Sequence, residues 1–238
     1  MDSTFYATPA EHIVRGWAEK VPAGFTFAPK LPRDLTPGVG AWAGAESPME
    51  DEGDPLRRFC DVAQALGPKL GPVLIQLGPE VGPDRWPAVE RFVAGLPSEM
   101  RWAIEFRQRG WVGPKLLELL RAHRVALVLV EGGGRSFRRE ETIELAIHPT
   151  ADFAYVRWIG SGPRIEDVSA VRINRDKELS VWAMALAALA ARVTSVYGYF
   201  SNHFQGHSPA SARMMQQLIG QKPVEPAELG PQTSLFQL

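Results

Sequence analysis

The sequence contains almost no cysteine and lacks long apolar runs. Cys60 is the single cysteine among 238 residues, which excludes an intramolecular disulfide and fits a reducing compartment. No apolar run reaches the roughly 20 residues that a membrane-spanning helix needs. The N-terminus also lacks the basic and then apolar pattern of a signal peptide. We therefore expect a soluble, cytoplasmic protein that makes no membrane contact.

An excess of positive charge and a dense set of metal ligands are also missing. The formal net charge of -1 excludes a bulk polycation, so any contact with nucleic acid must come from a local patch. Of the five histidines, only His203 and His207 fall near the end of a predicted strand. Two are too few for a multi-zinc barrel. The sequence therefore predicts neither a metal nor a cofactor.

The most informative stretch that is present runs from residue 101 to residue 111. Large apolar side chains such as Trp102 and Ile104 alternate with smaller or charged ones, and Glu105 and Arg107 share one side. Period-two alternation in so apolar a segment predicts a strand with both faces covered. Charges at the C-terminal end of such a strand either pair with their neighbours or contact a ligand. This stretch alone leaves both possibilities open.

Strand patterns alternate with helical patterns along the rest of the chain. We expect strands near residues 24–30, 72–77, 101–107, 125–130, 151–158 and 193–200, after a strand stub at residues 1–6. This order predicts an α/β protein with a parallel sheet and crossover helices. Polar side chains come at the C-terminal ends of nearly all these strands: Lys30, Gln76, Glu105, Arg107, Glu131, Arg157 and Asn202. In a barrel, these ends converge on one mouth.

The converging side chains suggest acid/base chemistry on an anion. Glu105 and Glu131 could form an acid/base pair, with Lys30, Arg107 and Arg157 holding an anionic substrate. The predicted substrate-binding set also contains Gln76, Asn202, Gly206 and His207. A phosphate is the expected anion, because the loops at residues 160–162 and 206–208 follow the last two strands, where barrels often bind phosphate. The alternatives are a network of ion pairs that satisfies itself, and glycines that only make turns.

Six short segments, in this order, resemble the YecE-like family, catalogued as domain of unknown function 72. They are Ser3–Tyr6, Phe27–Lys30 with Pro32 and Thr36, Gly71–Leu77, Glu105–Arg107 with Trp111, Asp152–Arg157, and Tyr199–Asn202 with Gly206 and His207. The resemblance implies a TIM-barrel-like (β/α) barrel over residues 1–220. Where the family has His after the threonine matching Thr36, this chain has Pro37, and Trp158 stands where the family has another His.

The resemblance also implies that the first strand and helix of the family are absent. Family members carry a Gly-Thr-Ser-Gly-Trp-like strand, a helix and a second strand before the segment that matches Ser3–Tyr6. We therefore expect a truncated barrel of about seven strands with two open sheet edges. Open edges favour pairing with another chain or a loss of stability.

The C-terminal residues 221–238 have the composition of a flexible tail, with Pro223, Pro226 and Pro231. The end of the tail, Gln232-Thr-Ser-Leu-Phe236, resembles the peptides with which DNA replication and repair proteins dock on the bacterial sliding clamp. The resemblance implies polar contacts for Gln232 and an apolar pocket for Leu235 and Phe236. The alternative is that these apolar side chains fold back onto the protein itself.

Two functions are compatible with the sequence. The first is a barrel protein that binds or processes a phosphate-bearing ligand, a small molecule or nucleic acid, at the mouth of the barrel. The second is a non-catalytic, nucleic-acid-associated protein that the tail recruits to the sliding clamp for DNA metabolism. Whether the protein is an enzyme stays open at this point.

Overall fold

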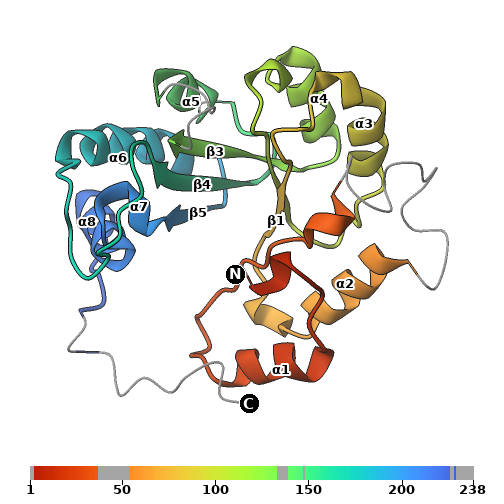
Figure 1. The fold of residues 1–238 in the computed structure, drawn as a ribbon, viewed down its shortest axis with the longest axis horizontal. Coiled ribbons are helices and arrows are strands. Elements are labelled where there is room, and N and C mark those ends of the chain that lie inside the picture. The colour runs from red at the N-terminus through yellow and green to blue at the C-terminus, as the bar shows by residue number, and fades with distance from the viewer. Residues whose placement is uncertain (1–2, 37–53, 133–138, 147, 226–227, 229–238) are drawn as a thin grey trace. The chain divides into compact units, whose positions relative to one another are not determined.

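The computed structural model describes residues 3–36, 54–132, 139–146, 148–225 and 228. Contacts divide these residues into two compact units. Unit 1 holds the described residues up to Phe106 together with Ala122–Val125, and unit 2 holds Arg107–Arg121 and the described residues from Ala126 onward. Figure 1 shows the helices and strands of both units.

Unit 1 contains three α-helices and two strands among its described residues. They are α1 (Glu11–Glu19), α2 (Pro55–Gln64), β1 (Val73–Gln76), α3 (Trp86–Ala94) and β2 (Trp102–Glu105). The sequence places the start of α2 clearly, because the Asp54 carboxylate accepts a hydrogen bond of 2.7 Å from the Leu56 amide and Pro55 occupies the first helical position.

The sheet of unit 1 is parallel, and its register is defined. Each residue of β1 is paired with a residue of β2, from Val73 opposite Trp102 to Gln76 opposite Glu105. On the other side of β1, the predicted strand at residues 24–30 makes only isolated bridges, Phe27 with Leu70 and Lys30 with Leu74. Pro29 contributes to this interruption, because a proline has no amide hydrogen to donate to a ladder.

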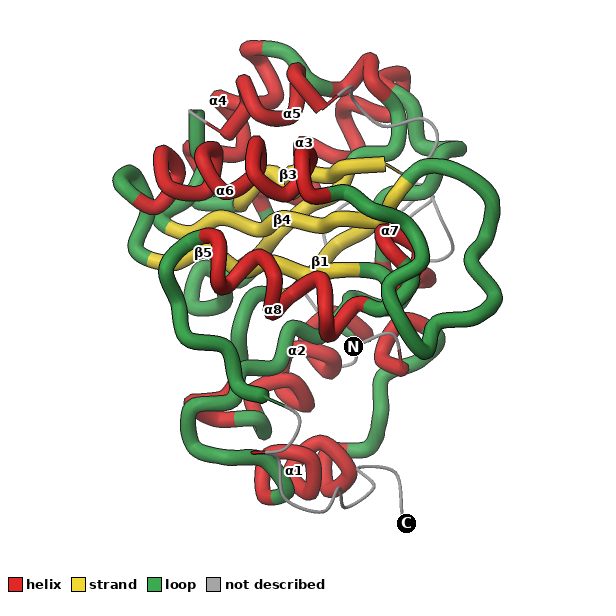
Figure 2. Tube along the Cα trace, turned by 90° about the vertical axis from the view of Figure 1, so that its left-hand side faces the viewer, coloured by secondary structure: helices red, strands yellow, loops and turns green. Residues whose placement is uncertain are grey.

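Unit 2 is built on three parallel strands and the helices that pack on them. Its elements are α4 (Pro114–Ala122, whose last residue belongs to unit 1), β3 (Ala126–Gly132), α5 (Arg139–Ala146), β4 (Phe153–Gly160), α6 (Asp176–Ala190), β5 (Ser195–Phe200), α7 (Asn202–Gln205) and α8 (Ser208–Leu218). Strand β4 lies between β3 and β5 and is parallel to both. Figure 2 shows α6 and α8 in front of these strands.

The core of unit 2 lies between this sheet and its helices. Trp158 of β4 packs edge-on against Trp182 of α6, with ring centroids 5.4 Å apart, and stacks on Phe200 of β5 at 4.2 Å. Leu129 of β3 belongs to the same cluster. Leu129 and Trp158 therefore mark the face of the sheet that the helices cover.

The α/β class and the parallel strands are confirmed, but the expected number of strands is not. The described residues contain five strands rather than about seven. The predicted strand stub at residues 1–6 is wrong where it can be checked, because Ser3–Phe5 is a 3-10 helix. The Thr4 hydroxyl bonds to both backbone groups of Lys30, which holds this segment against residue 30 by a side chain rather than by strand pairing.

The sequence does not predict helix α5. Most of the predicted tail cannot be compared with the structure. Gln232, Leu235 and Phe236, the predicted clamp-binding residues, lie outside the described residues. Within the described part of the chain, no helix combines the length and apolar character required to cross a bilayer.

Candidate functional site

Three of the predicted polar side chains gather on one face of the sheet in unit 1. We call Lys30, Gln76 and Glu105 the strand-end cluster. The register pairs Gln76 with Glu105 and Leu74 with both Lys30 and Ala103. Because side chains alternate along a strand, all three cluster residues point to the same side, opposite Ile75 and Ile104.

The strand-end cluster is buried although two of its members carry charge. The exposed fractions are 7% for Lys30, 8% for Gln76 and 3% for Glu105. The Gln76 Nε2 group donates a hydrogen bond of 2.5 Å to Glu105 Oε1, directly across the register pair. This bond fixes the orientation of the carboxylate, and a hydrogen bond to an ionised acceptor is stronger than one between neutral groups.

Lys30 is positioned by the short N-terminal helix. The Thr4 hydroxyl donates to the Lys30 carbonyl at 2.7 Å and accepts from the Lys30 amide at 2.9 Å. The Lys30 ammonium lies 3.8 Å from the centroid of the Phe5 ring, a cation–π contact. The sequence alone indicates no function for Thr4 or Phe5, although both lie in Ser3–Tyr6, the first of the six segments that resemble the family.

Glu131 is buried in a different setting. It lies on β3 on the same side as Leu129, which belongs to the core beneath the helices. Arg139 of α5 donates to Glu131 Oε1 from Nε at 2.8 Å and approaches the same oxygen with its terminal nitrogen at 2.7 Å. The indole of Trp182 on α6 donates to Glu131 Oε2. Glu131 therefore ties two helices to the strand.

The ion pair of Glu131 continues into a small network. The hydrogen bond to Glu131 raises the pKa of Arg139 above its ordinary value. Arg139 also lies 3.6 Å from a carboxylate oxygen of Glu178, which lies 3.5 Å from Arg175. Glu105 belongs to unit 1, whereas Glu131 is held on the helix-covered face of β3 in unit 2, and their pairing as acid and base stays a prediction.

The remaining predicted residues of unit 2 occupy varied positions. Arg107 is exposed beyond the end of β2, and Arg157 is half-buried on β4, on the same side as Tyr155 and opposite Trp158. Asn202 Oδ1 accepts from the Ser208 amide at 2.9 Å, and His207 Nδ1 accepts from the Ala210 amide at 3.3 Å. Both side chains cap the start of α8, so two amides that a phosphate at this position would need are already bonded.

Gly206 is required by packing in the loop before α8. Its φ of +111° is rarely adopted by residues with a side chain. A Cβ atom at this position would come within 2.6 Å of the Ala170 carbonyl oxygen. This observation explains the glycine without a ligand, and its predicted role in substrate binding stays a prediction.

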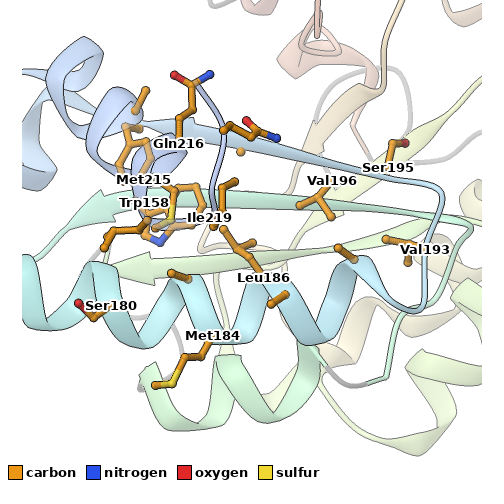
Figure 3. A pocket seen from close by; sticks show the side chains of 18 of the residues that line it. Trp158, Ser180, Met184, Leu186, Val193, Ser195, Val196, Met215, Gln216 and Ile219 are labelled. Atoms are coloured by element: carbon orange, nitrogen blue, oxygen red, sulfur yellow. The ribbon is translucent and has the colours of Figure 1, made fainter. Parts of the chain in front are cut away.

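One groove of unit 2 is lined mainly by apolar residues and is separate from the predicted site residues. It has a volume of about 920 Å³ and lies between α6, β5 and α8, with Trp158, Leu186 and Met215 among the lining residues. Figure 3 shows these side chains facing the groove from the helices and the strand. None of the lining residues is charged. A groove without ionisable groups offers no acid or base, so its size alone does not make it the site of chemistry.

Metal and thiol chemistry find little support in the described residues. No group of three or more His, Cys, Asp or Glu side chains in these ranges is arranged to hold a metal ion. Cys60 is buried in α2, and burial, together with nearby carboxylates, raises the pKa of its thiol to about 12. A thiol that stays protonated is a poor nucleophile and a poor ligand.

With this geometry established, comparison with known proteins places the chain in a family. The family described as "Protein of unknown function DUF72" matches residues 1–234. The chain belongs to the DUF72 family. This match confirms the family resemblance that the six short segments indicate. As a DUF72 protein, the chain is also similar to the UPF0759 protein YecE of Escherichia coli K12 and of E. coli O157:H7, with 26% identity over 106 residues in each case.

These curated relatives match over only part of their length. The matched segment covers 44% of this chain and 36% of each YecE protein. Two solved structures match over most of the chain. A DUF72 family protein of Enterococcus faecalis V583 has 18% identity and a TM-score of 0.71, covering 92% of this chain and 88% of that one. A DUF72 family protein of Thermotoga maritima MSB8 has 22% identity and a TM-score of 0.67, covering 90% and 80%. At these identities the likeness establishes the fold alone.

Proposed function

We propose that this DUF72 protein binds a phosphate-bearing ligand at the strand-end cluster and that Glu105 acts there as an acid or base. The observation that carries the proposal is the burial of Lys30, Gln76 and Glu105 on one face, where neighbouring parallel strands end. Ligands of parallel α/β proteins bind at the carboxyl ends of the strands. Polar groups that converge there form the default candidate for a site.

The buried charged side chains, Lys30 and Glu105, differ from ordinary surface charges, which water solvates. Taking a carboxylate or an ammonium group out of water costs several kcal/mol in the absence of compensation. Buried charges gather at functional sites, so a buried charge at the end of a strand is a candidate for binding or chemistry. A cation held in a low-dielectric setting also attracts an anion more strongly than an exposed cation does. Lys30 is therefore the proposed anion contact.

The bond between Gln76 and Glu105 supports the second part of the proposal. A general acid or base has to be held in one orientation while the proton moves. Gln76 does this through one carboxylate oxygen, Oε1, and the Glu105 carboxyl group is the proposed proton-transfer group. Arg107, Arg157, Asn202, Gly206 and His207 remain proposed contacts on the strength of the sequence alone.

The test compares binding and turnover in matched variants. Orthophosphate binding would be measured calorimetrically for Lys30→Met and for Lys177→Met, an exposed lysine on α6. Turnover would be measured over a panel of phosphomonoesters, phosphodiesters and sugar phosphates for Glu105→Gln and for Glu118→Gln, an exposed carboxylate on α4. Removal of a charged hydrogen-bonding partner weakens binding by about tenfold or more, and loss of a general acid or base slows turnover about 100-fold or more.

The controls make the outcomes separable. Unchanged phosphate binding by Lys30→Met would contradict the anion contact. Turnover that survives in Glu105→Gln would remove the acid/base role. Binding that depends on Lys30, together with no turnover on any compound of the panel, would leave a protein that binds phosphate without catalysis.

A second candidate function rests on the sequence of the tail. Gln232-Thr-Ser-Leu-Phe236 resembles clamp-binding peptides, and an apolar pair on a peptide is a common anchor for a partner groove. We propose that it recruits the protein to the sliding clamp in the cytoplasm. The test titrates purified clamp with a peptide of residues 222–238 and with its Leu235→Ala, Phe236→Ala double variant. No binding, or equal binding of both peptides, would end this proposal.

A further inference from the structure

A polar pocket in unit 2 lies outside the strand-end cluster. It has a volume of about 500 Å³ and is lined by Arg164, Ile165, Glu166, Val168, Asn202 and His203. We call it the loop pocket, because one wall is the loop between β4 and α6 and the other is α7. Figure 2 shows this loop running beside α7. The volume falls within the range of about 300–1,000 Å³ that is common for small-molecule sites.

The two walls of the loop pocket are tied together by hydrogen bonds. The Arg172 and Ile173 amides both donate to the Gln205 carbonyl, at 2.6 and 3.1 Å. Arg175 Nε donates to the Phe204 carbonyl at 2.6 Å. These bonds hold the loop against α7, so the pocket does not have to form when a ligand arrives. A preformed site loses less entropy on binding.

Hydrogen bonds also orient the donors of the loop pocket. His203 Nδ1 accepts from the Ile165 amide at 3.3 Å, so the neutral imidazole carries its proton on Nε2 and can donate it. Asn202 Oδ1 accepts from the Ser208 amide at 2.9 Å, which leaves the amide NH₂ group of Asn202 as a donor. Both side chains line the pocket with one end already fixed.

Arg164 adds the cation. Within the described part of the chain, it makes no hydrogen bond or ion pair, unlike Arg172, which is bonded to Asp167. The hydrogen bonds from Ser169, followed by Arg172, lower the pKa of Asp167, and Asp167 does not line the pocket. A guanidinium group with two neighbouring neutral donors matches the oxygen atoms of a phosphate.

Glu166 narrows the class of ligand further. Its carboxylate lines the same pocket and would repel a bare anion, but it accepts hydrogen bonds from hydroxyl groups. We infer that the loop pocket binds a small phosphorylated polyol, with the phosphate on Arg164, Asn202 and His203 and a hydroxyl group on Glu166. Asn202 is also among the contacts proposed for the strand-end cluster, but Arg164, Glu166 and His203 are not, so variants of these three residues separate the two proposals.

The test titrates the full-length protein with glucose 6-phosphate, orthophosphate and glucose, and follows the ¹⁵N signal of the His203 imidazole by NMR. Glucose 6-phosphate should bind more tightly than orthophosphate, and glucose should not shift the signal. Arg164→Gln should weaken binding of both phosphates at this signal by about tenfold or more. Arg192→Gln, which removes an exposed arginine of unit 2, should bind like the parent protein.

Glu166→Gln should change the affinity for orthophosphate in the opposite direction to Arg164→Gln. Loss of the negative charge should strengthen orthophosphate binding by about threefold, while the preference for glucose 6-phosphate should shrink. A His203 signal that does not respond to either phosphate, or that responds equally in Arg164→Gln, would overturn the inference. Because Lys30→Met leaves the loop pocket intact, a response lost only in Lys30→Met would support the strand-end cluster and contradict the loop pocket.

Discussion

The ends of β2 and β3 present two buried carboxylates that resemble each other in sequence and differ in structure. Glu105 and Glu131 each come at the C-terminal end of an apolar strand, with exposed fractions of 3% and 6%. Glu105 shares its face with Lys30 and Gln76 in unit 1. Glu131 lies on the helix-covered face of its sheet and is bonded to Arg139 and Trp182.

This comparison separates two uses of a buried charge. A carboxylate bonded to side chains from two helices holds those helices in place, and its removal should affect stability. A carboxylate on the face where polar strand ends gather should affect ligand chemistry instead. The position at a strand end alone does not distinguish them; the side of the strand on which the residue lies does.

The largest expected effect on stability comes from Trp182, the residue of α6 that donates to Glu131. Trp182 is fully buried and packs against Trp158, so Trp182→Ala should lower the free energy of unfolding by about 3–5 kcal/mol. Trp182→Phe keeps most of the packing but removes the donor to Glu131, and it should cost about 1–3 kcal/mol. Equilibrium denaturation measures both. A Phe variant as stable as the parent would show that the indole bond contributes little.

Glu131→Gln should lower the free energy of unfolding by about 1–3 kcal/mol, less than a fully buried ion pair costs to break. The cost is smaller than for a fully buried ion pair because the side chain of Arg139 is 31% exposed, so water can solvate part of its charge. The matched control is Glu118→Gln, which should be neutral. If Glu131→Gln changes turnover while leaving stability intact, the structural assignment is wrong.

The pH dependence of stability should carry a signal from unit 1. Burial, with Asp61, Glu99 and Asp54 nearby, raises the pKa of Cys60 from 9.0 to about 12. Above pH 9 the unfolded chain releases the thiol proton while the folded chain keeps it, so this stabilisation is complete below pH 9 and is lost between pH 9 and 12. The loss approaches about 1.4 kcal/mol for each pH unit. Denaturation of Cys60→Ala should lack this slope; an unchanged slope would refute the assignment.

Glu105→Gln should have the smallest effect on stability, below about 1 kcal/mol, because the glutamine oxygen can still accept the bond from Gln76. Its proposed effect is on turnover instead. Thermal unfolding and the substrate panel, measured on one preparation, check the two expectations together. A loss of stability as large as that of Glu131→Gln would show that Glu105, like Glu131, serves mainly to stabilise the fold.

The sequence predicts the faces of β2 well because its alternation is strict. Ala103 and Glu105 fall on one side and Ile104 on the other, and the register places Gln76 beside Glu105. The sequence also identifies the family, since six ordered segments are more specific than any one of them.

The surroundings of Glu131 could not be predicted in the same way. The apolar run at residues 125–130 has no alternation to define its faces, and the pairing of β3 with β4 shifts between Glu131 and Gly132. The partner Arg139 lies on α5, whose apolar pattern is weak. Long-range bonds such as that of Thr4 to Lys30 likewise leave no local periodicity.

The most direct test measures how much orthophosphate raises the midpoint of thermal unfolding. It compares three proteins, Arg164→Gln as the parent and the same protein with Glu131→Gln or Lys30→Met added; Arg164→Gln removes the cation of the loop pocket. A ligand that binds only the folded state raises this midpoint. The account predicts that Glu131→Gln starts from a lower midpoint but gains as much from phosphate as its parent, while Lys30→Met starts near the parent and gains nothing. An equal gain in Lys30→Met and the parent would contradict the proposed role of the strand-end cluster.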